Sequence, residues 1–265
     1  MKNFSITFIQ TSLAWENADA NISNFNKLTS SINKTDVIVL PEMFTTGFTM
    51  QPAKNAEPID GKGLQWMKQK AAKKNCVITG SICVEENKCF YNRLYWVEPT
   101  KIQHYNKRHL FRMGAEDQHY KVGAEKIITT INGWKILPLV CYDLRFPVWS
   151  RNKWTKKNNE LIADYDVLMY VANWPEVRSY PWKQLLIARA IENQCYVVGV
   201  NRIGVDGNGF NHTGDSMVIN PLGQIISHTK ANEESVETVL LDYELLSELR
   251  KKFPMGMDAD NFEIS

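Results

Sequence analysis

Hydrophobic residues along the chain follow two periods, and these alternate from one end to the other. Short apolar or alternating runs predict β-strands, and longer stretches with an apolar residue at every third or fourth position predict amphipathic helices. Strands are predicted at 4–10, 36–42, 76–84, 90–97, 101–106, 136–140, 166–172, 195–201, 215–219, 224–227 and 236–241. Helices are predicted at 18–31, 63–73, 149–156 and 181–193.

Turn sequences at 98–100 and 220–223 join two of these strand pairs into predicted hairpins. The chain shows no linker, repeat or low-complexity tract. Alternating strands and helices of this kind predict one α/β domain over residues 1–265, with helices outside the sheets. The short polar tail after Phe253 is a candidate for contact with a partner chain.

Three chemically reactive side chains each stand at the carboxyl end of a predicted strand. They are Glu42, Lys107 and Cys141. In open α/β sheets the functional site lies at this edge, so we expect the three groups to meet. The backbone N–H groups of the turn after Cys141 favour an anion, so its thiol is expected to ionise more readily than an ordinary buried cysteine.

Each of these residues also has an ordinary structural interpretation. A free cysteine in an apolar strand is usually a small buried hydrophobic residue. Glu42 can cap the segment after its strand, and Lys107 can be a solvated loop charge. A triad of Cys141 with His212 and Asp215 is a further alternative, although those two residues fall near a predicted turn.

The composition narrows the class of protein. The chain has 265 residues, 44% of them hydrophobic and 23% charged, which suits a globular fold with a sizeable core. The formal net charge is +2 without a basic block, so neither nucleic acid nor a membrane is expected as a partner. No secretory or membrane-spanning segment is evident, and we expect a cytoplasmic location. The five cysteines lack zinc-site spacing, so no metal is expected.

Three segments together resemble the motifs of the nitrilase superfamily of carbon–nitrogen hydrolases. They are residues 40–44 (LPEMF), 105–111 (YNKRHLF) and 140–147 (VCYDLRFP). Their order matches the Glu–Lys–Cys triad of that superfamily, and the similarity covers nearly the whole chain. Residues 111–120 (FRMGAEDQHY) are most similar to the bacterial ω-amidase branch.

The resemblance implies a four-layer α-β-β-α sandwich and a homodimer. It also implies hydrolysis of the terminal amide of a small dicarboxylate monoamide, such as 2-oxoglutaramate, without a cofactor. Cys141 would form a thioester, Glu42 would carry protons, and Lys107 with the backbone N–H of Tyr142 would stabilise the oxyanion.

Further site residues follow from the same resemblance. Glu116 matches a second glutamate near the triad, which orients Lys107 or the substrate; its alternative is a surface carboxylate. Asn173 and Trp174 match positions that line the pocket, although Trp174 also suits packing at its rim. The substrate carboxylate needs a cation, for which the sequence does not rank Arg108, Arg112, Arg145 and Arg178.

Three other functions fit parts of this pattern. The same fold and triad suit N-carbamoyl amines or nitriles as substrates. A non-catalytic interaction protein can use the same scaffold, because a fold does not determine a function. A thiol redox sensor is the third alternative, and it is disfavoured because no cysteine lies close in sequence to Cys141 to resolve a disulfide.

Overall fold

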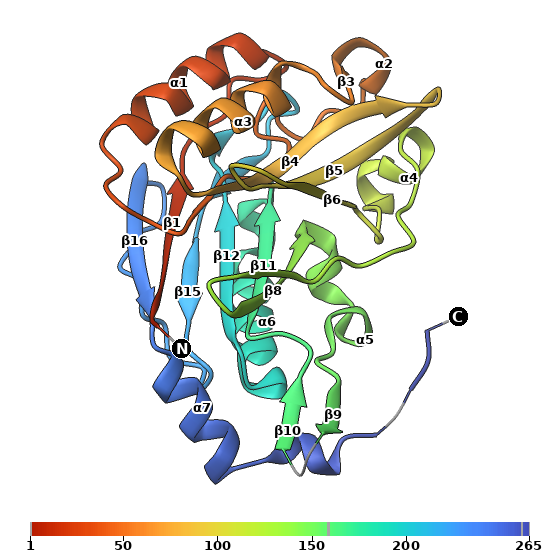
Figure 1. The fold of residues 1–265 in the computed structure, drawn as a ribbon. Helices are drawn as coiled ribbons and strands as arrows, with labels where there is room; N and C mark the ends of the chain where they lie inside the picture. The colour runs from red at the N-terminus through yellow and green to blue at the C-terminus, as the bar shows by residue number, and fades with distance from the viewer. Residues whose placement is uncertain (1, 158–159, 261, 265) are drawn as a thin grey trace.

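Two β-sheets lie face to face in the middle of the molecule (Figure 1), in a computed structural model that describes residues 2–157, 160–260 and 262–264. The first sheet has the strand order β16-β1-β2-β4-β5-β6, with β3 beside β4. Its strands are β1 (Phe4–Gln10), β2 (Val37–Val39), β3 (Glu57–Pro58), β4 (Val77–Glu86), β5 (Cys89–Val97), β6 (Ile102–Asn106) and β16 (Ser235–Leu241). The second sheet has the order β15-β12-β11-β8-β7. Its strands are β7 (Thr129–Ile131), β8 (Trp134–Val140), β11 (Val167–Ala172), β12 (Tyr196–Asn201) and β15 (Met217–Ile219).

Helices cover the outer faces of both sheets. Helices α1 (Ala18–Ser30) and α3 (Lys62–Lys74) lie over the first sheet, and α6 (Ser179–Asn193) lies over the second (Figure 1). The predicted four-layer α-β-β-α sandwich is therefore confirmed. The shorter helices are α2 (Pro52–Asn55), α4 (Glu116–His119), α5 (Pro147–Ser150) and α7 (Tyr243–Lys252). Two small antiparallel strand pairs lie outside these sheets: β9 with β10 (Trp154–Lys157, Glu160–Ala163) and β13 with β14 (Ile203–Val205, Asn211–Thr213). The described residues also include 3₁₀ helices η1 (Arg112–Gly114), η2 (Cys141–Arg145), η3 (Glu176–Arg178) and η4 (Met255–Asp258).

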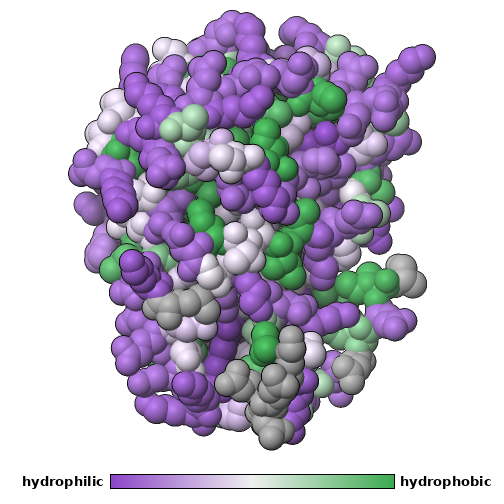
Figure 2. Space-filling view, viewed as in Figure 1, coloured by the Kyte–Doolittle hydropathy of each residue, from purple (hydrophilic) through white to green (hydrophobic). Residues whose placement is uncertain are grey.

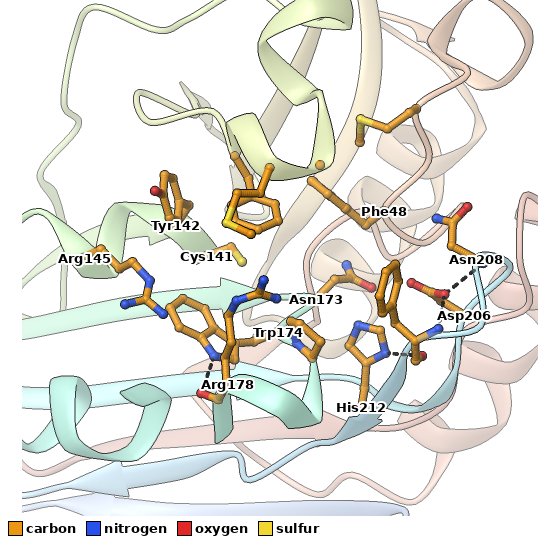
Figure 3. Close-up of a pocket in the computed structure, with 16 residues that line it drawn as sticks. Phe48, Cys141, Tyr142, Arg145, Asn173, Trp174, Arg178, Asp206, Asn208 and His212 are labelled. Carbon is orange, nitrogen blue, oxygen red and sulfur yellow. Dashed lines mark hydrogen bonds between the residues drawn. The ribbon is translucent and has the colours of Figure 1, made fainter. Parts of the chain in front are cut away.

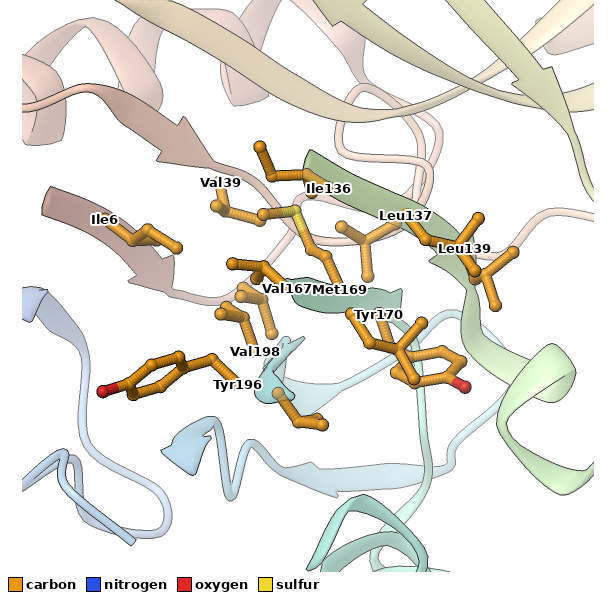
Figure 4. Packing of buried hydrophobic residues seen from close by; sticks show 14 of the residues in the cluster. Ile6, Val39, Ile136, Leu137, Leu139, Val167, Met169, Tyr170, Tyr196 and Val198 are labelled. Carbon is orange, nitrogen blue, oxygen red and sulfur yellow. The ribbon is translucent and has the colours of Figure 1, made fainter. Parts of the chain in front are cut away.

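The main hydrophobic core fills the space between the sheets. Ile6 and Val39 of the first sheet pack in one cluster with Ile136 and Val167 of the second (Figure 4), and all four are fully buried. A second cluster lies between the first sheet and helices α1 and α3. Because fully burying one such side chain stabilises a fold by about 1.5–3 kcal/mol, these two clusters hold the layers together.

Strand direction places one edge of each sheet at the same end of the molecule. Strands β1, β2 and β4 are parallel, as are β8, β11 and β12. Strand β6 runs in the direction of β4, because each is antiparallel to β5. The carboxyl ends of β2, β6, β8 and β11 therefore face one region, which is where the candidate site lies.

The predicted helix over 149–156 is wrong. Helix α5 ends at Ser150, and Trp154–Lys157 forms strand β9, which pairs with β10. Between them the backbone N–H of Asn152 donates to a side chain of α6, at 2.8 Å, instead of to a helical carbonyl. The β-branched and aromatic residues that follow then extend into a hairpin.

Two further differences concern the carboxyl-terminal third. The predicted hairpin at 215–227 is reduced to strand β15 and a single bridge between Ile219 and Ile225. Helix α7 is an element that the hydrophobic pattern did not reveal, because only Leu246 of its residues is buried. Its signal was the N-cap Asp242, whose side chain accepts from the N–H groups of the first turn. In the described ranges, no helix is long and apolar enough to cross a membrane.

Candidate active site

The ends of β2, β6 and β8 bring Glu42, Lys107 and Cys141 to one place. Lys107 Nζ lies 2.9 Å from Glu42 Oε1, and both side chains are fully buried. Cys141 is 8% exposed, and the charges of Glu42 and Lys107 both act on its thiol. The prediction that these three side chains lie close together is therefore confirmed.

Glu116 belongs to the same buried cluster. Its carboxylate oxygens lie 3.0 and 2.9 Å from Lys107 Nζ, and the backbone N–H of Phe111 donates to it at 2.6 Å. Glu116 is fully buried, which excludes the alternative of a surface carboxylate. Asn92 completes the cluster by donating from Nδ2 to Glu42 at 2.7 Å and to Glu116 at 3.1 Å. The sequence analysis missed Asn92, because it lies inside strand β5 and not at a strand end.

The charges in this cluster support one another. Burial lowers the pKa of Lys107, but the negative charges of Glu116 and Glu42 outweigh that effect and raise its pKa above the ordinary value. The lysine therefore stays charged. Burial also raises the pKa of Glu116; Lys107 opposes this effect, whereas Glu42 adds to it.

Cys141 begins the 3₁₀ helix η2 in a left-handed backbone conformation, with φ of 44°. Such a conformation is unfavourable for a residue with a Cβ atom and persists only when its surroundings hold it. Asp143 supplies that support. Its carboxylate accepts from Val140 N at 3.0 Å, from Tyr105 Oη at 2.8 Å and from His109 N at 3.0 Å.

The expectation of an easily ionised thiol is wrong. Burial is the largest effect on Cys141 and raises its pKa well above the ordinary value. The negative charge of Glu42 and the hydrogen bond to its carboxylate raise the pKa further, and Lys107 offsets these effects only in part. The site therefore holds Cys141 as a neutral thiol beside a carboxylate.

A cavity of about 360 Å³ opens onto Cys141 (Figure 3). Tyr142 lines it next to the thiol, and so do Asn173 and Trp174, at the positions predicted to line the pocket. Asn173 also supports the cluster: its backbone N–H donates to Glu42 Oε2 at 2.7 Å. The remaining lining residues include both apolar and polar side chains: Phe48, Met50, Phe111, Met113, Gly114, Arg145, Pro175, Arg178, Asp206, Asn208, Phe210 and His212.

Two of the four candidate arginines lie at the cavity. Arg145 and Arg178 line the cavity, whereas Arg108 and Arg112 do not. The guanidinium of Arg145 lies 5.0 Å from the ring centre of Trp174, and that of Arg178 points into the cavity (Figure 3). Within the part of the chain that the structure describes, neither arginine forms an ion pair with an acidic side chain. The cavity therefore presents two positive charges to a ligand.

The alternative triad of Cys141, His212 and Asp215 is not assembled. His212 lines the cavity, but its Nδ1 faces the backbone carbonyl of Phe210 at 3.1 Å. Asp215 pairs with Lys183 at 2.8 Å. Burial lowers the pKa of His212, so its imidazole is neutral at neutral pH. Among the described residues, no group of three or more His, Cys, Asp or Glu is arranged to hold a metal ion.

Comparisons with known proteins agree with this geometry. The family model for carbon-nitrogen hydrolase matches residues 5–251. Omega-amidase YafV of Escherichia coli K12 is 47% identical over 265 residues, which is 100% of both chains. The 2-oxoglutaramate amidase of Bacillus subtilis 168 is 34% identical over 260 residues, covering 96% of this chain and 97% of the relative.

A solved structure is similar over the full length. XC1258 from Xanthomonas campestris, described as a CN-hydrolase superfamily protein with an arsenic adduct in the active site, has a TM-score of 0.95 and 40% sequence identity, with 100% of both chains covered. The chain thus belongs to the carbon–nitrogen hydrolase family, and the resemblance to the nitrilase superfamily is confirmed. Its full-length relatives include an ω-amidase and a 2-oxoglutaramate amidase, the branch that the sequence pattern predicted.

Proposed function

We propose that the protein is an ω-amidase that hydrolyses the terminal amide of a small dicarboxylate monoamide, such as 2-oxoglutaramate, and releases ammonia. The observation that carries this proposal is the cavity itself. One wall holds a thiol beside a buried Glu–Lys–Glu cluster, and the cavity also holds two arginines without acidic partners among the described residues. The names of the full-length relatives support the same activity.

Cys141 is the proposed nucleophile, and Glu42 is the proposed base. As sulfur bonds to the amide carbon, the thiol proton passes to Glu42 and the carbonyl oxygen becomes an oxyanion. The charge of Lys107 and the backbone N–H of Tyr142 stabilise that oxyanion. Glu42 then gives the proton to the amide nitrogen, the C–N bond breaks, and ammonia leaves a thioester on Cys141.

Hydrolysis of the thioester reuses the same groups. Glu42 accepts a proton from water as the water oxygen bonds to the acyl carbon, and the C–S bond of the second tetrahedral intermediate then breaks. The proton returns to sulfur, and the dicarboxylic acid leaves. Glu116 acts as a positioning residue, because both of its carboxylate oxygens contact Lys107 Nζ and one of them also accepts from the backbone N–H of Phe111.

The free carboxylate of the substrate is proposed to bind Arg178, with Arg145 nearby. An arginine can donate two parallel hydrogen bonds to a carboxylate, and this geometry fixes the orientation of the substrate. Tyr142, Asn173 and Trp174 complete the walls around the carbon chain.

We also propose a single hydrolase domain, active as a homodimer in the cytoplasm, with a small amide as its ligand and no nucleic-acid or membrane partner. The family model spans residues 5–251, and both sheets contribute to one core. The five cysteines are free thiols, which suits a reducing compartment. The dimer is an extension from the nitrilase superfamily.

The test is ammonia release from 2-oxoglutaramate, an N-carbamoyl amine and a nitrile by the wild type, Cys141→Ala and Cys89→Ala. We expect the wild type to prefer the amide, Cys141→Ala to be inactive and folded, and Cys89→Ala to retain activity. A mass increase on Cys141 during turnover would identify the thioester. Ammonia release by Cys141→Ala would refute the mechanism, and a preference for the nitrile or carbamoyl compound would refute the substrate class.

A further inference from the structure

Asn92 is a buried polar residue of strand β5 for which the steps above give no role. Asparagine is disfavoured inside strands, where β-branched and aromatic residues pack better. The side chain is fully buried, and the backbone carbonyl accepts a hydrogen bond from Lys107 N at 2.9 Å. Asn92 is therefore tied to the acidic cluster through both its main chain and its side chain.

One amide group serves two carboxylates. Asn92 Nδ2 lies 2.7 Å from Glu42 Oε1 and 3.1 Å from Glu116 Oε1, and Lys107 Nζ contacts the same two oxygens at 2.9 and 3.0 Å. Both hydrogens of the NH₂ group are used, one for each acid. Hydrogen bonds to an ionised carboxylate favour the ionised form, so this geometry opposes the repulsion between two like charges.

The other end of the amide shows what this arrangement requires. Asn92 Oδ1 is buried and has no hydrogen-bond partner in the described part of the chain. Burying an acceptor without a partner is unfavourable. Turning the amide over would place Oδ1 against the oxygens of Glu42 and Glu116, so the acids dictate its orientation. Leucine would fill the same space without this penalty, which indicates that the donor group is what the site needs.

We propose that Asn92 is a positioning residue that keeps Glu42 ionised and oriented as the base for Cys141. This inference rests on the proposed function, in which Glu42 takes the thiol proton. Asn92 acts through the acid and not on the substrate, since its amide N–H groups contact Glu42 and Glu116. Its effect is therefore expected on the ionisation of the catalytic cluster and not on the affinity for substrate.

The test is the pH dependence of kcat/KM for ammonia release from 2-oxoglutaramate in Asn92→Leu and Asn92→Asp. Activity requires ionised Glu42, so the rate falls on the acidic side, and losing a donor raises the pH at which it falls. The acidic limb of the profile is the pH range over which the rate falls as the pH decreases. Losing a hydrogen bond to a charged group corresponds to an upward shift of this limb by about 1–2 pH units. We expect that shift in Asn92→Leu, with a ~10-fold or larger loss of kcat/KM at pH values below the wild-type limb and a smaller loss above it. Asn92→Asp, which is almost isosteric, should shift the limb further.

Asn152→Leu is the matched control. Asn152 is also a fully buried asparagine, but its Nδ2 donates to the backbone carbonyls of Tyr165 and Asn193 at 3.0 and 3.2 Å. This variant should lose stability without moving the acidic limb. If both Asn92 variants keep the wild-type limb, whatever their rates, Asn92 is only structural and the inference is overturned.

Glu42→Gln separates this inference from the proposed function. If the Glu42→Gln enzyme is active, Glu42 is not the base, and the proposed mechanism fails. An inactive Glu42→Gln enzyme, together with Asn92 variants that titrate like the wild type, would leave the mechanism intact and reject only the role of Asn92.

Discussion

Replacing Arg178 by methionine tests how the cavity recognises its substrate. The change removes the guanidinium but keeps most of the apolar side chain, and Arg178 has no acidic partner among the described residues that would be left unpaired. A hydrogen bond to a charged group contributes about 1.5–3 kcal/mol, which corresponds to a ~10- to ~150-fold loss of kcat/KM. Because Arg145 lines the same cavity and keeps part of the positive field, we expect the lower half of that range.

The assay compares two amides that differ in one group. Ammonia release is measured with the monoamide of glutaric acid and with pentanamide, which has the same chain length and a methyl group in place of the carboxylate. Arg178→Met should raise KM for the charged amide, with a small change in kcat, because the carboxylate is bound equally in the ground state and the transition state. Its effect on the neutral amide should be small.

Arg112→Met is the control for loss of a positive charge near the site. Arg112 lies 3.8 Å from Asp117, its side chain is 86% exposed, and it does not line the cavity. It should behave like the wild type with both amides. If Arg178→Met impairs both amides equally, the arginine supports the fold of the cavity and the reasoning is refuted. If neither rate changes, the carboxylate binds elsewhere.

Three other variants test the cluster and its surroundings. Lys107→Met leaves the buried carboxylates of Glu42 and Glu116 without a cation, so the free energy of unfolding in urea should fall by about 3–5 kcal/mol; adding Glu116→Gln should restore part of it but no activity. An unchanged urea midpoint in Lys107→Met would contradict this. Cys141→Gly should be more stable than Cys141→Ala by about 1 kcal/mol, since φ of 44° favours glycine; equal midpoints would show that the turn relaxes. Because the pKa of His212 is lower in the folded state than in the unfolded state, the free energy of unfolding should fall as the pH drops below about 6.5. If the free energy of unfolding of His212→Asn falls with pH as steeply as that of the wild type, this reasoning is wrong.

Much of the fold could be predicted because the spacing of apolar residues along the chain indicates which side chains are buried. The strand over 4–10 agrees residue for residue with β1, and the strand at 236–241 begins one residue late. The predictions failed where packing, and not periodicity, decides the structure. The segment 149–156 has a helical pattern, yet contacts made by Asn152 with residues far along the chain end the helix early.

The candidate site was predictable to the extent that it follows from strand ends. Glu42 and Lys107 follow co-directional strands of the first sheet and Cys141 follows a strand of the second, so their meeting needs only the strand directions and the face-to-face packing of the two sheets. Asn92 lies within a strand, and its role depends on the register that pairs β5 with β6. Arg178 could not be ranked either, because a flexible cation reveals its direction only when the cavity is seen.

The failed expectation about Cys141 has a mechanistic reason. Local sequence indicates the N–H groups of a turn, but ionisation depends on every charge that the fold places nearby, and Glu42 raises the pKa of the thiol. In the proposed mechanism this is no obstacle. When the thiol proton passes to Glu42, the negative charge that Glu42 loses appears on Cys141. The net charge of the buried cluster does not change, so the thiolate forms by moving a charge within the site and not by adding one to a site shielded from water.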